Sequence, residues 1–82
     1  MNTNLSFSTQ APHPTTSDVH SFSAVLLPDG VSIEVNQMAF PIPWDKVTDM
    51  EFLASEFSLM QVWQFRIIVE LLGQAYRAKD LF

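Results

Sequence analysis

Two histidines and one group of carboxylates are the residues of this chain whose types could support chemistry. His13 and His20 lie in a polar N-terminal segment, with no cysteine in the chain and no acid at a metal-ligand spacing from either histidine. The two glycines of the chain form neither of the phosphate-binding motifs G-x-x-x-x-G-K-S/T and G-x-G-x-x-G, and no G-x-S-x-G nucleophile motif is present. We therefore expect no metal site and no cofactor.

The carboxylates gather near the middle of the chain. They are Asp45, Asp49, Glu51 and Glu56, with Lys46 as the one cation among them. General acid–base catalysis needs groups that converge in a dry pocket. On one short helix these side chains would point outward into water. We therefore expect a charged surface there, no catalytic residues and no enzyme activity.

Charge and composition exclude several classes of protein. The chain has 82 residues, with four Lys and Arg against nine Asp and Glu, which gives a net charge of −5. Nucleic acids and anionic membranes both attract clustered cations, so we expect neither as a partner. Apolar residues make up 48% of the chain and aromatic residues 12%, which is too much for a wholly disordered protein. The length allows one small domain.

The sequence shows neither a secretory signal nor a membrane-spanning segment. The N-terminus lacks the cationic and apolar regions of a secretory signal. The most apolar stretch, residues 59–72, is interrupted by charged and amide side chains and is shorter than the about 20 apolar residues of a membrane span. A chain without cysteine also suits a reducing compartment. We expect a cytoplasmic protein.

The first 20 residues differ in composition from the rest. They are rich in Ser, Thr, Asn, Gln and Pro, and they show no helical or strand period. Such a segment buries too little apolar area to offset the entropy lost on ordering. We predict a disordered tail at residues 1–20 and a single domain at 21–82. Leu5 and Phe7, spaced by two as in a strand, are the exceptions that could dock on the domain or on a partner.

The strongest local pattern predicts a β-hairpin. Alternate residues are apolar on both sides of a turn: Phe22, Ala24 and Leu26 before it, and Val31, Ile33 and Val35 after it. At the turn, Pro28 presets φ for the first central position and Asp29 suits the second. We expect Gly30 to adopt the left-handed conformation of a bulge.

A third strand would follow the hairpin. The alternation continues through residues 38–42 in the opposite parity, so a turn or bulge after Asn36 must reset it. Pro41 and Pro43 have no amide hydrogen to donate, which confines such a strand to the edge of a sheet.

The rest of the chain predicts helix. A short acidic helix begins near Asp45 or Thr48, and Ser58 with Gln61 fits the capping box of a second helix that runs to about Arg77. No Gly or Pro separates the two patterns, so one continuous bent helix is the alternative. The predicted fold class is α+β: a disordered tail, then a β-hairpin or three short antiparallel strands packed against the acidic helix and the long C-terminal helix.

The long helix predicts an interface. Its apolar arc covers roughly 220°, about twice the width of an ordinary amphipathic stripe. A ribbon of two or three short strands is too small to cover that arc, and large exposed apolar patches usually mark a binding surface. One flank carries this prediction: Met60, Ile67, Leu71 and Ala78. We also expect Phe52 and Trp44, which lie among the acids, to act as apolar anchors for a partner.

Two functions follow from these patterns. The first is a non-catalytic protein–protein interaction module (an accessory subunit, adaptor or regulator) that forms a homodimer through the long helix, binds a protein partner, or does both. The alternative is an acidic inhibitor that occupies a basic nucleic-acid-binding site on a target protein. Salt discriminates between them, because the binding of the inhibitor should weaken steeply with ionic strength and an apolar contact should not.

Overall fold

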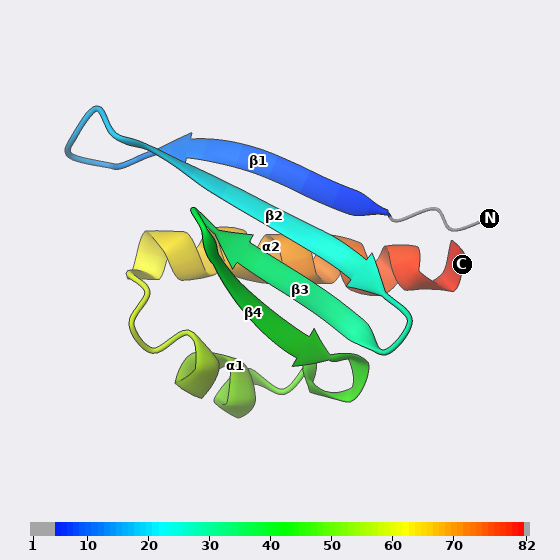
Figure 1. Ribbon diagram of the computed structural model, residues 1–82. Helices are drawn as coiled ribbons and strands as arrows, with labels where there is room; N and C mark the ends of the chain where they lie inside the picture. Colours follow the sequence, from blue (N-terminus) through cyan, green and yellow to red (C-terminus); the bar gives the residue numbers. More distant parts are fainter. Residues whose placement is uncertain (1–4, 82) are drawn as a thin grey trace.

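A four-stranded antiparallel sheet covered on one face by two helices forms the protein (Figure 1). The computed structural model describes residues 5–81. The elements in chain order are β1 (Ser6–Pro12), β2 (Val19–Leu27), β3 (Gly30–Val35), β4 (Met38–Pro43), the 3-10 turn η1 (Trp44–Lys46), α1 (Met50–Glu56), α2 (Val62–Ala78) and the 3-10 turn η2 (Lys79–Leu81). The strands lie in the sheet in the same order as in the chain. The α+β class is confirmed.

The predicted hairpin is β2–β3. Leu27 pairs with Gly30, so Pro28 and Asp29 form a two-residue turn. A second tight turn joins β3 to β4 and resets the parity as expected, because Val35 pairs directly with Met38. Asn36 opens this turn with a φ of 56°, a left-handed conformation that asparagine tolerates better than most residues.

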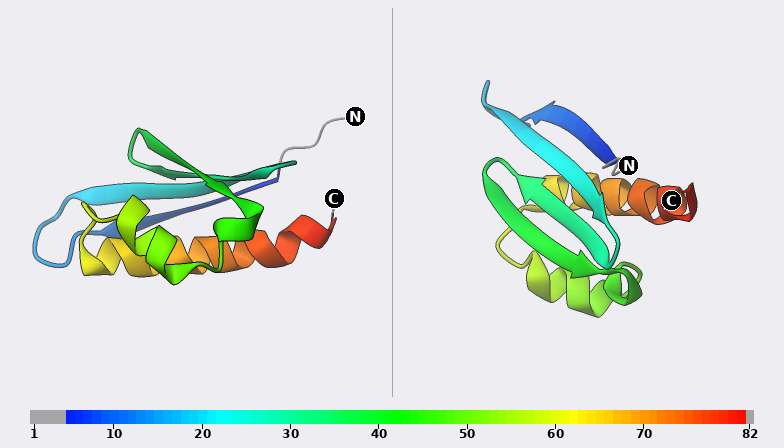
Figure 2. Two further views of the ribbon diagram at one scale, coloured as in Figure 1. Left: turned by 90° about the horizontal axis from the view of Figure 1, so that it is seen from below. Right: turned by 45° about the vertical axis from the view of Figure 1, so that its right-hand side comes forward.

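The core lies between the sheet and α2. The alternate residues of β2 and β3 named above all point toward the helices and are buried, as is Ile42 of β4. From the helical layer the buried side chains are Val47, Leu53, Phe57, Ile68, Leu71, Leu72, Ala75 and Ala78. Figure 2 shows both helices on the same side of the sheet, so the other sheet face is open. One apolar layer therefore holds the domain together.

The predicted disordered tail is wrong for the residues that the structure describes. Residues 6–12 form β1, which pairs with β2 from Ser6↔Val25 to Pro12↔Val19. Phe7 and Leu5 are half-buried and pack against the core, so the spacing of two between them was the strand signal. Of the other β1 residues, Ala11 also packs against the core, whereas Ser6, Ser8, Thr9 and Gln10 are polar. The predicted boundary between residues 20 and 21 falls inside β2.

The two helices are separate. Asp49 caps α1, and its side chain accepts a hydrogen bond from the Phe52 amide at 3.1 Å. Gln61 and Gln64 form a reciprocal capping box that starts α2. The side chain of Gln64 accepts from the Gln61 amide at 2.9 Å. Among residues 5–81, no helix has both the length and the apolar character needed to cross a bilayer.

Gly30 is required for a reason other than the one predicted. The described glycines have no positive φ, so Gly30 is not a left-handed bulge residue. It pairs with Pro43, and a Cβ on Gly30 would overlap the carbonyl oxygen of Ile42 in β4. Close approach of two backbones therefore selects glycine at the start of β3.

Gly30→Ala should lower the free energy of unfolding by about 1–3 kcal/mol, because β4 must shift to admit the new methyl group. Gly73→Ala is the matched control. The added Cβ meets only an Arg77 nitrogen at 3.7 Å, and alanine is favoured over glycine inside a helix by about 1 kcal/mol. Urea denaturation of both variants measures the difference between their free energies of unfolding. Equal stability of the two variants would contradict the close contact between β3 and β4.

Deletion of residues 1–20 should destabilise the domain, because it removes β1 together with the first two residues of β2 and uncovers the backbone of the rest of β2. We expect the thermal midpoint, followed by circular dichroism, to fall by at least about 5 °C, which corresponds to roughly 1 kcal/mol for a domain of this size. An unchanged midpoint would show that β1 contributes nothing to stability.

Candidate protein-binding groove

Two of the residues predicted to form an interface on α2 belong to the core. Leu71 is 4% exposed and Ala78 is 8% exposed, so neither is available to a partner. Met60 and Ile67 are half-buried and pack against the core from its margin. The prediction of a free apolar flank was wrong for Leu71 and Ala78 because the sheet is wider than two or three strands. β1, β2 and β3 all lie over α2.

Part of the apolar surface of α2 remains open on the side that faces α1. A groove of about 330 Å³ runs between the two helices. Its lining is mostly apolar: Val47, Thr48, Met50, Leu53, Val69, Leu72, Gly73, Tyr76 and Arg77. Two large side chains stand at its rim, with Met50 53% exposed and Tyr76 41% exposed. Ligand-binding pockets in proteins span about 300–1,000 Å³, so this groove is at the small end of that range.

Gly73 forms part of the groove. Glycine inside a helix costs about 1 kcal/mol relative to alanine. No close neighbour requires it here, because a Cβ would meet only the Arg77 guanidinium, at 3.7 Å. The missing side chain leaves space between the helices, and the guanidinium lies over the bare Cα. Gly73 therefore lowers the stability of α2 and at the same time keeps the groove open.

The C-terminal end of α2 is basic and aromatic. The Lys79 ammonium lies 4.9 Å from the ring centroid of Tyr76 and 5.9 Å from that of Trp44. Trp44 is half-buried, and its indole N–H donates to the Leu27 carbonyl at 3.1 Å. Lys79 pairs with Asp80 at 3.7 Å, whereas Arg77 makes no ion pair within the described part of the chain. The two aromatic rings therefore lie beside the Lys79 ammonium, while the Arg77 guanidinium lies next to Gly73 in the lining of the groove.

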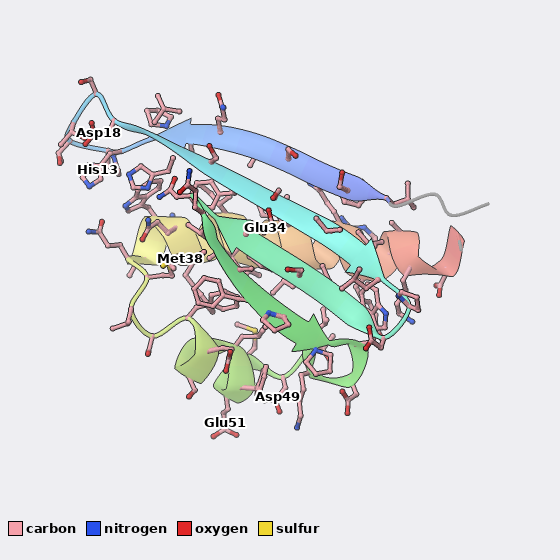
Figure 3. All side chains as sticks on the ribbon, in the orientation of Figure 1. His13, Asp18, Glu34, Met38, Asp49 and Glu51 are labelled. Atoms are coloured by element: carbon pink, nitrogen blue, oxygen red, sulfur yellow. The ribbon has the colours of Figure 1, made fainter. Side chains whose placement is uncertain are left out.

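The other helix presents carboxylates. Asp45, Glu51 and Glu56 are exposed, and Figure 3 shows Glu51 pointing away from the sheet. Asp45 lies in η1 and Asp49 caps α1, so Glu51 and Glu56 are the acids within the helix itself, and none of the four carboxylates lines the groove. Phe52 is half-buried beside Lys46, whose ammonium lies 5.8 Å from its ring centroid. Phe52 does not line the groove.

The two histidines lie together at one end of the molecule, where the β1–β2 loop meets the first turn of α2. The centroids of the two imidazole rings are 6.0 Å apart. Both rings are in a T-shaped arrangement with Trp63, with centroid distances of 5.5 Å for His13 and 5.1 Å for His20. Nδ1 of His20 is 3.3 Å from the side-chain nitrogen Nε2 of Gln64 and 3.4 Å from the side-chain nitrogen Nδ2 of Asn36. His13 therefore joins the β1–β2 loop to α2, and His20 joins the start of β2 to α2 and to the β3–β4 turn. Within residues 5–81, no three His, Asp or Glu side chains lie close enough together to hold a metal ion.

The open face of the sheet has a second hollow. It measures about 550 Å³ and is lined mainly by small polar side chains of β1 and β2, with Glu34 from β3. Figure 3 shows Glu34 on this face, and the Ser23 hydroxyl donates to its carboxylate at 3.5 Å. The hollow offers hydrogen-bonding groups but no exposed apolar anchor. It is a weaker candidate than the groove.

The groove was missed in the sequence because its two walls come from different helices. The sequence contained one indication of the groove, Gly73 inside the second helical pattern. Its position on that helix indicates a groove only once it is known that α1 lies on the same side. Comparison of the chain with known protein families, with curated proteins and with solved structures finds no match. The interpretation of the groove therefore depends on its geometry alone.

Leu71→Glu should unfold the protein, because an unpaired charge buried in this core costs several kcal/mol against a total stability of about 5–15 kcal/mol. Leu59→Glu makes the same chemical change at a residue that is almost fully exposed, and it should alter stability by less than about 0.5 kcal/mol. Circular dichroism and thermal unfolding compare the two variants. A folded Leu71→Glu protein would mean that this flank of α2 is open after all.

Proposed function

We propose that the protein is a non-catalytic protein–protein interaction module whose groove between α1 and α2 receives an apolar side chain of a partner protein. The observation that carries the proposal is the open apolar space at Gly73, flanked by the exposed rim residues Met50 and Tyr76. Burial of one large apolar side chain contributes about 1.5–3 kcal/mol. Exposed methionine and tyrosine are also the residue types enriched at interface centres.

The charges around the groove favour one class of partner. Arg77 lines the groove, and Lys79 follows it two residues along the chain. The opposite wall comes from the segment that carries Asp49, Glu51 and Glu56, although these acids lie outside the lining itself. A segment that places a carboxylate next to its apolar anchor would pair with the guanidinium of Arg77. Basic residues farther along the same segment would lie near Asp49 and Glu51. This asymmetry would fix the direction in which a peptide lies in the groove.

The acidic inhibitor is the second candidate, and one observation supports it. Asp45, Glu51 and Glu56 are exposed, and among residues 5–81 the one cation paired with this group is Lys46, 3.8 Å from Asp49. An inhibitor would bind a basic target mainly through these carboxylates. Its affinity would fall steeply with added salt, whereas binding in the apolar groove would change little. A cytoplasmic location stays a prediction for either function.

Gly73→Leu should abolish binding in the groove while the protein stays folded, because leucine is a good helix former and its side chain fills the space. The probe is a set of peptides selected from a random phage-displayed library on the wild-type protein and measured by isothermal titration calorimetry. We expect an aromatic or aliphatic residue next to Asp or Glu in these peptides.

Gly73→Ala is the matched control, since its methyl group fits with only an ordinary contact to Arg77. The leucine variant should weaken binding more than about tenfold, equivalent to 1.4 kcal/mol, and the alanine variant much less. Selected peptides that bind Gly73→Leu as tightly as the wild type, or a library that yields no binder, would contradict the proposal.

A further inference from the structure

The two edges of the sheet differ in the backbone groups that they leave unpaired. At the β1 edge, the Leu26 amide donates to the Leu5 carbonyl at 2.9 Å, and the His13 amide donates to the Asp18 carbonyl at 2.8 Å. Pairs that exchange hydrogen bonds alternate along an antiparallel ladder. The odd-numbered residues of β1 therefore bond to β2. The backbone N–H and C=O groups of Ser6, Ser8 and Gln10 point away from the sheet.

The β4 edge is blocked. The register Val31↔Ile42, Ile33↔Phe40 and Val35↔Met38, with the Asn36 amide donating to Ser21 on the neighbouring strand, directs the even-numbered residues of β4 toward β3. The outward positions are Ala39, Pro41 and Pro43. Because proline has no N–H, Ala39 is the single donor of that edge. Natural sheets use proline in this way to prevent strand addition.

Between Ser6 and Gln10, β1 has neither the charges nor the prolines that usually protect an edge. Residues 1–17 contain no Asp, Glu, Lys or Arg, and Pro12 stands at the end of the strand. The outward-pointing residues are two serines and a glutamine. A chain with a net charge of −5 repels its own copies over most of its surface. At β1, two copies can meet without bringing like charges together.

The β1 edge is also complementary to itself. Antiparallel pairing about a twofold axis through Ser8 sets Ser6 of one copy opposite Gln10 of the other, and Ser8 opposite Ser8. All three positions then have outward-pointing backbone groups, so every free N–H meets a free C=O. On the helix side, half-buried Phe7 lies beside Thr9 of the second copy, an aromatic and β-branched cross-strand pair that is favourable in sheets.

We propose that the protein forms a homodimer in which the β1 strands of two copies pair antiparallel and join their sheets into one continuous sheet. The occupant of the edge is a second copy because the edge is neutral and matches itself under twofold symmetry. Association stops at two copies, since the dimer exposes only the proline-blocked β4 edges. Figure 2 shows β1 at the opposite edge of the sheet from α1, so dimerisation leaves the groove free. The inference goes beyond the proposed partner binding and is independent of it.

Ser8→Pro tests the interface. Among residues 5–81 the Ser8 amide has no partner by the register above, so proline removes a donor of the dimer and no hydrogen bond of the described fold. Ala39→Pro is the matched control, because it removes the outward amide of the other edge. Sedimentation equilibrium of the full chain should give a dimer for the wild type and for Ala39→Pro. Ser8→Pro should raise the dimer dissociation constant at least about tenfold.

A second variant tests the register without relying on proline. The chain has no cysteine, so Ser8→Cys introduces a unique thiol. Paired residues that exchange hydrogen bonds have Cα atoms about 5.5 Å apart, which is within the range of a disulfide. Oxidation should therefore give a covalent dimer of Ser8→Cys and none of Ala39→Cys. A wild-type protein that stays monomeric up to roughly 100 μM, a Ser8→Pro protein that dimerises like the wild type, or equal cross-linking of the two cysteine variants would overturn the proposal.

Discussion

The burial of α2 against the inner faces of β2 and β3 is the contact on which the rest of the structure depends. Residues 5–81 have a single core layer, and the buried residues of α2 lie against the alternate apolar residues of the two central strands. β1 and β4 extend this layer on either side, and α1 covers the part under β4 (Figure 2). The outer strands β1 and β4 are less buried than β2 and β3, because each of them has a neighbouring strand on one side only. The features available for binding, the groove and the free strand edge, accordingly lie at the margins.

The central elements could be predicted from the sequence because their patterns have high contrast. In β2 and β3, large apolar residues alternate with polar ones, and the two-residue turn of Pro28 and Asp29 confirms the hairpin. The change of parity after Val35 correctly indicated a turn, since a two-residue loop that begins at Asn36 exchanges odd for even positions. The prolines of β4 correctly indicated an edge. The alternation in the sequence therefore predicts the observed strand wherever one face of that strand is clearly apolar.

β1 could not be predicted in the same way, because one side of the strand is open and the other meets only the rim of the core. Phe7 is its one large side chain between Leu5 and Ala11, and the remaining residues are small and polar. Its order comes from backbone pairing with β2, to which side-chain hydrophobicity contributes little. The groove escaped prediction for a related reason: it depends on the position of α1 relative to α2, a long-range quantity that no local pattern contains. The long helix was expected to be exposed because β1 was missing from the predicted sheet.

Two features of the chain depart from what stability alone would select. Gly73 weakens a helix although alanine would fit, and β1 leaves three amides unpaired in a sheet whose other edge is blocked by proline. A sequence that folds to one structure usually satisfies local preference and global packing together, so local violations that the packing does not require tend to occur at functional positions. In a domain this small, with its core committed to a single layer, binding surfaces must use residues outside that layer. Gly73 and the outer edge of β1 are such residues, and they lie far enough apart for each to be occupied without the other.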